Sequence, residues 1–229
     1  MKHSGKATLA GLKLIGVGLA ALLLVLVGAL LGKYLGTLIL NFLTWPLVAL
    51  WVFFAAFTLY FFRDPDPLVP TAANLVIAPA HGRVDVIDQT VEPEFMGGPC
   101  RRISIFLSIF DVHVQNAPVA GKISFFKHTP GQYLNALRTD SAKFNENVLI
   151  GLDCAEPPGE KIGVRLIAGL IARRIVPWVA PGDEVRRGER IGLIQFGSRV
   201  ELYLPLRASI KVNPGDRVIG GETVVAALD

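Results

Sequence analysis

The chain has 229 residues, of which 52% are hydrophobic, and a formal net charge of +4 at pH 7. This length is enough for one medium-sized domain together with a membrane segment. The excess positive charge lies in residues 1–62, which contain four lysines and no acid, so the remaining chain balances 19 basic against 19 acidic side chains. A nucleic-acid-binding domain would carry clustered Lys and Arg, so we expect no nucleic-acid partner.

Two long uncharged runs occupy the N-terminal part of the chain. Leu14–Gly32 has 19 residues, which as a helix would span about 29 Å, close to the hydrocarbon thickness of a bilayer. Tyr34–Phe62 has 29 residues, contains Pro46 and is rich in aromatic side chains, so it could tilt or lie partly at the interface. We expect a membrane anchor over residues 1–63, with hydrophobic helices at about 14–32 and 36–62.

The charges that flank these runs predict their orientation. Lys2, Lys6 and Lys13 resemble the start of a signal peptide, but the first apolar run is too long for one and a second run follows at once. Only a short stretch around Lys33 separates the runs, so they form a hairpin. The positive-inside rule then places both ends in the cytoplasm. The predicted location is the cell (inner) membrane, with the soluble domain facing the cytoplasm.

The composition changes at Asp64-Pro65-Asp66-Pro67, which ends the second helix and begins a domain over residues 64–229. Short β-branched runs follow, separated by Gly, Pro, Asn and Asp, and this texture predicts a mostly-β sandwich or barrel. The clearest candidate strands are Arg83–Ile87, Arg101–Leu107, Lys122–Phe126, Val148–Leu152, Ile162–Ala168 and Val200–Leu204. The segment Ala136–Asn145 fits either a short helix or a loop.

One pattern occurs twice in the C-terminal part. Residues 181–191 and 214–224 both read P-G-D-x-V-x-x-G-E-x-[IV], at an offset of 33 residues. Pro-Gly-Asp favours a turn, the valine begins a strand, and the later glycine permits a second turn. Such units recur in lipoyl/biotinyl-like β-sandwiches, so we predict a domain of this type behind the N-terminal transmembrane helical hairpin. No lysine stands at an obvious hairpin tip, which argues against a lipoylated carrier.

The cysteines and histidines indicate neither a disulfide scaffold nor a metal site. Cys100 and Cys154 are the two cysteines, and neither belongs to a Cys-x-x-Cys pair. Two thiols in a chain of this size are typical of reduced cysteines in a cytosol-facing domain. With four histidines and isolated cysteines, no metal-ligand spacing is found, and we predict no metal.

Three positions carry side chains that could do chemistry. Gly197-Ser198 lies between two apolar runs, where a serine after glycine in a strained bend could attack the preceding carbonyl, although most such pairs are ordinary turns. His81 stands at a glycine-flanked strand entry and could shuttle protons, or be only an exposed turn histidine. Asp111 and His113 would share one strand face, so that the carboxylate orients the imidazole. The alternative for His113 is a purely structural role.

Together these stretches resemble the phosphatidylserine decarboxylase proenzymes, specifically the short, membrane-anchored bacterial branch. The resemblance depends on an ordered set of motifs over the whole soluble part, and this set is more specific than the Gly-Ser pair alone. The motifs are Phe61-Phe62-Arg63-Asp64-Pro65, Pro79-Ala80-x-Gly82, Asp111-Val112-His113-Val114, Ala117-Pro118-Val119-Ala120-Gly121, Ile167–Ile175 and Phe196-Gly197-Ser198-Arg199-Val200.

The resemblance implies a pyruvoyl-dependent carboxy-lyase that converts phosphatidylserine in the bilayer to phosphatidylethanolamine. Ser198 would attack the Gly197 carbonyl and cleave the precursor into a β chain, residues 1–197, and an α chain, residues 198–229. The serine would become a covalent pyruvoyl group, so pyruvate is the implied cofactor and no other cofactor-binding residue is expected. That group would form a Schiff base with the substrate amine, and His113 would reprotonate the substrate carbon.

The chain departs from the family pattern at two positions. His81 stands where the family usually has an aspartate that helps to activate the serine, and Asn116 stands where relatives have Arg or His. Two alternatives therefore stay open. One is an uncleaved membrane-anchored β-sandwich that acts as an adaptor or lipid-binding module; the other is pyruvoyl chemistry on a different amine substrate. The oligomeric state is also open, with a homo-oligomer among the alternatives.

Overall fold

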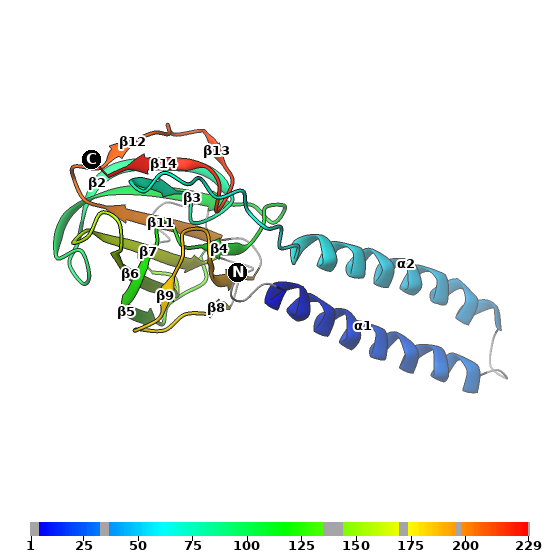
Figure 1. The fold of residues 1–229 in the computed structure, drawn as a ribbon. Helices are drawn as coiled ribbons and strands as arrows, with labels where there is room; N and C mark the ends of the chain where they lie inside the picture. The colour runs from blue at the N-terminus through cyan, green and yellow to red at the C-terminus, as the bar shows by residue number, and fades with distance from the viewer. Residues whose placement is uncertain (1–4, 33–36, 135–143, 170–173, 196–197, 229) are drawn as a thin grey trace. The chain divides into compact units, whose positions relative to one another are not determined.

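The computed structural model describes residues 5–32, 37–134, 144–169, 174–195 and 198–228 (Figure 1). The chain divides into two compact units, one formed by Gly5–Asp64 and the other containing Pro65–Asp229. The first unit is helical and the second consists of β-strands.

The helical unit consists of α1 (Lys6–Leu31) and α2 (Thr37–Phe61). By length and composition alone, both helices are candidates to cross a membrane. Helix α1 begins at Lys6, eight residues before the uncharged run. Lysine is a good helix former, and its long side chain can carry the charge from the helix into water. The expected two-helix organisation is present.

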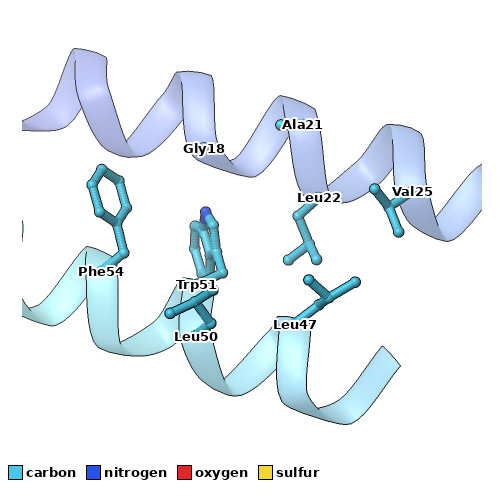
Figure 2. Close-up of a pocket in the computed structure, with 8 residues that line it drawn as sticks. All are labelled: Gly18, Ala21, Leu22, Val25, Leu47, Leu50, Trp51 and Phe54. Atoms are coloured by element: carbon cyan, nitrogen blue, oxygen red, sulfur yellow. The ribbon is translucent and has the colours of Figure 1, made fainter. Parts of the chain in front are cut away.

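A cavity of about 410 Å³ is lined by residues of both helices. Figure 2 shows the apolar side chains that line it. Trp51 of α2 points toward Gly18 of α1, where a Cβ would lie 2.9 Å from the indole Nε1. The missing side chain at Gly18 therefore lets the indole approach the backbone of α1. The other lining residues are Ala21, Leu22, Val25, Leu47, Leu50 and Phe54.

The described residues of the β unit form three sheets (Figure 1). A curled eight-stranded sheet has the order β13-β2-β3-β11-β7-β6-β5-β9, and two three-stranded sheets have the orders β1-β14-β12 and β4-β10-β8. The strands are β1 (Leu75–Ile77), β2 (Gly82–Glu92), β3 (Gly98–Leu107), β4 (Val114–Asn116), β5 (Gly121–Thr129), β6 (Asn147–Cys154), β7 (Lys161–Ala168), β8 (Ile175–Pro177), β9 (Glu184–Val185), β10 (Arg190–Ile194), β11 (Ser198–Leu204), β12 (Ser209–Ile210), β13 (Arg217–Val218) and β14 (Val224–Ala227).

The mostly-β prediction and all six candidate strands are confirmed. The finer lipoyl/biotinyl-like assignment stays a prediction. Residues 136–143 of the segment Ala136–Asn145 lie outside the described residues.

Strand β11 is buried along its whole length and has two different faces. Val200, Leu202 and Leu204 belong to the main hydrophobic core, together with residues from most other strands of the domain. Arg199, Glu201 and Tyr203 alternate with them and therefore point to the opposite face. On that face Glu201 accepts hydrogen bonds from Arg102 and Tyr203. Ser198 has the same parity as the core residues.

The repeated Pro-Gly-Asp segments form matching turns. Gly182 and Gly215 have φ values of 100° and 101°, in a region that favours glycine. The carboxylates of Asp183 and Asp216 each accept a hydrogen bond, at 2.8 Å, from the backbone N–H three residues earlier. The predicted turns are therefore present in both copies.

A second pair of segments matches in the same way. Residues 78–84 and 117–123 both read A-P-x-x-G-x-[VI], at an offset of 39 residues. Each segment opens a strand that pairs with one copy of the Pro-Gly-Asp repeat: β2 with β13, and β5 with β9. We call residues 78–85 with 214–224 the first half-unit, and residues 117–124 with 181–191 the second half-unit. The domain thus uses one backbone arrangement twice.

Candidate active site

Ser198 is the first residue of β11 and lies between two neighbouring strands. It pairs with Leu107 of β3 on one side and with Ala168 of β7 on the other. The residue is fully buried, and its hydroxyl makes no hydrogen bond within the described part of the chain. Leaving a buried hydroxyl unsatisfied costs about 1–3 kcal/mol, so a serine with only a structural role would be expected to have a partner. Gly197 lies outside the described residues.

The backbone of His113 is tied to the strand that leads toward Ser198. Its carbonyl accepts a hydrogen bond from the N–H of Ile194, the last residue of β10, at 3.1 Å. Ile194 precedes Ser198 by four residues, a stretch that spans at most about 14 Å. The His113 side chain is fully buried. The fold therefore bonds a buried histidine to β10, the strand that precedes β11 in the chain.

The orientation of this imidazole comes from a backbone carbonyl. His113 Nδ1 lies 2.9 Å from the carbonyl oxygen of Asp111. Because a carbonyl can only accept, Nδ1 carries the proton, and the neutral ring then has its lone pair on Nε2. The imidazole is thus fixed in a tautomer that can take up and release a proton at Nε2.

The expectation that Asp111 and His113 share one strand face is wrong, because the strand begins only at Val114. Residues Ser108 to Asp111 form a turn, closed by the hydrogen bond from Asp111 N–H to the carbonyl of Ser108. The Asp111 carboxylate accepts from the N–H of Ser108 at 2.8 Å and pairs with Arg217. It therefore holds the loop between β3 and β4.

His81 lies in the bend directly before β2 and is half-buried. A Cβ at Gly220 would come within 3.0 Å of its ring, so the glycine makes room for the imidazole. Just beyond, Arg83 pairs with Phe106 of β3, and Phe106 also pairs with Arg199 of β11. His81 and Ser198 therefore lie at the same end of the sheet, two strands apart, with roughly 10 Å between the main chains.

Asn116 joins the segments that carry the two histidines. Its backbone N–H donates to the carbonyl of Pro79 at 2.8 Å, two residues before His81. Its side-chain amide donates to the carbonyl of Gly188 at 2.9 Å. Asn116 is buried and follows His113 by three residues. The position that departs from the family pattern thus has a structural role between the bend at His81 and β4.

Sequence reasoning missed the ion pair behind the serine. The guanidinium of Arg199 is buried and makes two contacts with the carboxylate of Asp85, at 2.9 and 2.6 Å. It also donates to the hydroxyl of Ser104. A bidentate pair of this kind fixes geometry as well as charge. The available signal was a cation directly after the serine, at the start of a strand that alternates polar side chains with Val200, Leu202 and Leu204.

The two cysteines are free and buried. Burial raises the pKa of the Cys154 thiol to about 12 and also raises the pKa of Cys100. Since the thiolate is the reactive form, both cysteines are poor nucleophiles at neutral pH.

Comparison with known proteins gives one consistent result. The family model described as phosphatidylserine decarboxylase matches residues 54–226. A phosphatidylserine decarboxylase proenzyme of Desulfotalea psychrophila is 46% identical over 173 residues, covering 76% of this chain and 80% of the relative. A phosphatidylserine decarboxylase proenzyme of Symbiobacterium thermophilum is 43% identical over 187 residues, covering 82% of this chain and 86% of the relative. The family model thus covers 173 of the 229 residues and most of the β unit.

Proposed function

Because the chain belongs to the phosphatidylserine decarboxylase family and is therefore a carboxy-lyase, we propose that it decarboxylates phosphatidylserine to phosphatidylethanolamine with a pyruvoyl group made from Ser198. The observation that carries this proposal is the fully buried Ser198 hydroxyl, which has no hydrogen-bond partner in the described chain. Such a group is costly to keep unless it has a chemical use.

The proposed maturation begins at Ser198. Its Oγ attacks the carbonyl carbon of Gly197, and the peptide nitrogen leaves, so that an ester replaces the amide and Ser198 gains a free amino group. Loss of the Ser198 α-proton then expels the Gly197 carboxylate. Water releases the nitrogen as ammonia and leaves a ketone at the new N-terminus. The products are residues 1–197 and residues 198–229.

The surroundings of Ser198 suit the group that this reaction would produce. The hydroxyl has no hydrogen bond to break before it attacks, and its neighbours Leu107 and Ala168 are buried and apolar. When present, the pyruvoyl ketone supplies the electron-withdrawing carbonyl that accepts electrons as carbon dioxide leaves.

Two histidines have separate roles in this proposal. His113, held at Nδ1 by the Asp111 carbonyl, delivers a proton from Nε2 to the substrate carbon that has lost carbon dioxide. His81, in place of the usual aspartate, removes the proton from the Ser198 hydroxyl during maturation. Both roles need only proton transfer, for which imidazole is suited near neutral pH.

Helices α1 and α2 anchor the enzyme in the cell membrane, and the β unit faces the cytoplasm. The proposal is supported by the length and apolar composition of both helices and by the basic residues that flank them. A membrane anchor also gives a reason for a lipid substrate, because a soluble amine would not require the site to be held at the bilayer.

Intact-mass spectrometry of the purified full-length protein tests the proposal. We expect two chains, with the smaller one carrying a ketone that reacts with a hydrazide. Ser198→Ala should give one chain of 24.8 kDa without hydrazide labelling or decarboxylation of phosphatidylserine in vesicles. The matched control is Ser209→Ala, which changes a part-buried serine at the start of β12 in the same C-terminal fragment. This variant should mature normally. A single unlabelled wild-type chain would contradict the proposal.

A further inference from the structure

A cavity of about 660 Å³ lies where β2 begins and β3 ends. Its walls come from these two strands, from the turn that precedes β13, and from the loop that leads to His113. The lining residues are Arg83, Val84, Asp85, Phe106, Ser108, Asp111, Pro214, Gly215 and Arg217. The cavity is thus built mainly from the first half-unit and lies at the end of the sheet where Ser198 begins β11.

The two carboxylates in this cavity are already neutralised. Both oxygens of Asp85 contact the buried guanidinium of Arg199. The Asp111 carboxylate accepts from the N–H of Ser108 and pairs with Arg217. Together with Arg83, the group contains three guanidinium cations and two carboxylates. It therefore carries an excess of one positive charge.

Arg83 supplies that excess charge. Its Nε donates to the carbonyl of Gly215 at 3.1 Å, and the described chain offers no carboxylate to its terminal nitrogens. In the pairing of β2 with β13, Arg83 stands directly opposite Arg217. Like charges directly opposite each other destabilise a pair of strands. An anion bound between the two side chains would remove this repulsion.

The second half-unit shows that the fold does not require two cations here. Its equivalent cavity has a volume of about 440 Å³ and is lined by Lys122, Asp153 and Glu184, among others. In the pairing of β5 with β9, Lys122 stands opposite Glu184. The same backbone arrangement thus carries a cation opposite an acid in one half-unit and two cations in the other.

The cavity lies near the candidate active site but on the other face of the sheet, because cross-strand partners share a face and Arg199 points away from the face of Ser198. Phe106, which lines it, pairs with Arg83 on one side and with Arg199 on the other. Arg199 follows Ser198, so the main chains of Arg83 and the reactive segment are roughly 10 Å apart. Because Ser198 is the first residue of β11, a phosphoserine headgroup can bridge this separation around the end of the sheet.

We propose that this cavity binds the phosphodiester of the phospholipid headgroup, with Arg83 as the principal anion-binding residue and Arg217 opposite it. The assignment rests on the proposed function, because phosphatidylserine is the substrate that would bring a phosphodiester to Ser198. Guanidinium groups bind phosphate oxygens through paired charge-assisted hydrogen bonds. Arg83 is exposed, so its terminal nitrogens are accessible to a ligand.

Binding of soluble headgroup analogues to the full-length protein in detergent micelles tests this site. The probes are glycerophosphoserine, L-serine and inorganic phosphate, titrated by calorimetry. Arg83→Gln should weaken glycerophosphoserine binding by about tenfold or more, the loss expected for a charge-assisted hydrogen bond. Arg83→Lys should restore part of it. Lys122→Gln, which removes a charge at the equivalent position of the second half-unit, should leave binding unchanged.

Kinetics separate this inference from the proposed function. In vesicles containing phosphatidylserine, Arg83→Gln should raise KM by about tenfold with little change in kcat, because the contact is made equally before and during the reaction. Wild-type binding and turnover by Arg83→Gln would overturn the phosphate site while leaving the proposed function intact. Lack of decarboxylation by the wild type, with Arg83-dependent binding retained, would instead remove the proposed function. Inorganic phosphate that binds as tightly as glycerophosphoserine would overturn the headgroup assignment in favour of a free-phosphate site.

Discussion

The two half-units of the β domain share a backbone but differ in the side chains that could serve chemistry. The first half-unit has His81 before its strand, where the second has Ala120. Across each strand pair, Arg83 faces Arg217 in the first half-unit, whereas Lys122 faces Glu184 in the second. One scaffold can therefore be purely structural in one copy and carry functional groups in the other.

The shared backbone has a common physical cause. A Cβ at Gly82 would lie 2.2 Å from the carbonyl oxygen of Phe106, and a Cβ at Gly121 would lie 2.2 Å from that of Asp153. Only glycine permits this close approach of two main chains. The glycines are thus explained by packing in both half-units, while His81 and Arg83 are not.

The largest expected effect is at His113, which belongs to neither half-unit. His113→Gln should lower the rate of decarboxylation by about 10²–10⁴-fold, the usual contribution of a positioned proton donor, while the precursor still cleaves. Single-turnover assays on the matured variant measure this. His128→Gln removes an exposed histidine paired with Glu146 and should behave as wild type. Normal turnover by His113→Gln would assign the proton donor elsewhere.

The next effect tests whether the first half-unit can be made like the second. His81→Ala copies Ala120 and should slow maturation by about 10²-fold, because the Ser198 hydroxyl loses its base. The appearance of the cleaved chain after synthesis, followed by gel electrophoresis, gives the rate. The reciprocal change Ala120→His should leave maturation unchanged. Maturation of His81→Ala at the wild-type rate would show that another group activates the serine.

A smaller effect, on stability, should be equal in the two half-units. Gly82→Ala and Gly121→Ala each push a Cβ against a carbonyl oxygen and should lower the free energy of unfolding by about 2 kcal/mol or more. Both are best measured in the uncleaved Ser198→Ala background, by denaturant unfolding of the full-length protein in micelles. A large cost at one glycine and none at the other would contradict the equivalence of the two half-units.

The smallest functional effect is expected at Cys154, which lines the cavity of the second half-unit. Cys154→Ala should leave turnover unchanged. Because burial raises the pKa of this thiol to about 12, its thiolate fraction at pH 8 is low, and a disulfide reagent should label it far more slowly than in the unfolded chain. The labelling rate should rise as the pH approaches 12. Fast labelling of the native protein at pH 8 would contradict the burial of the Cys154 thiol.

Local sequence patterns predicted the six longest strands but not the arrangement around the site. Arg101–Leu107 and Val200–Leu204 were found because β-branched runs bounded by turn residues carry their signal within a few positions. The alternation in Asp111-Val112-His113 predicts a strand before Val114. This prediction is wrong, because Ser108–Asp111 form a turn and the strand begins only at Val114. The outcome depends on the hydrogen bonds in both directions between Ser108 and Asp111 and on the pairing of Asp111 with Arg217.

The sequence by itself determined the family, the two apolar helices, the mostly-β class and the identity of Ser198, His113 and His81 as candidates, because each follows from short-range pattern or motif. Only the tertiary structure decided that Ser198 is buried without a hydrogen-bond partner, that a backbone carbonyl orients His113, and that Arg83 faces Arg217. The physical reason is that strand register joins residues more than a hundred positions apart, and no local pattern encodes which charge will lie opposite which.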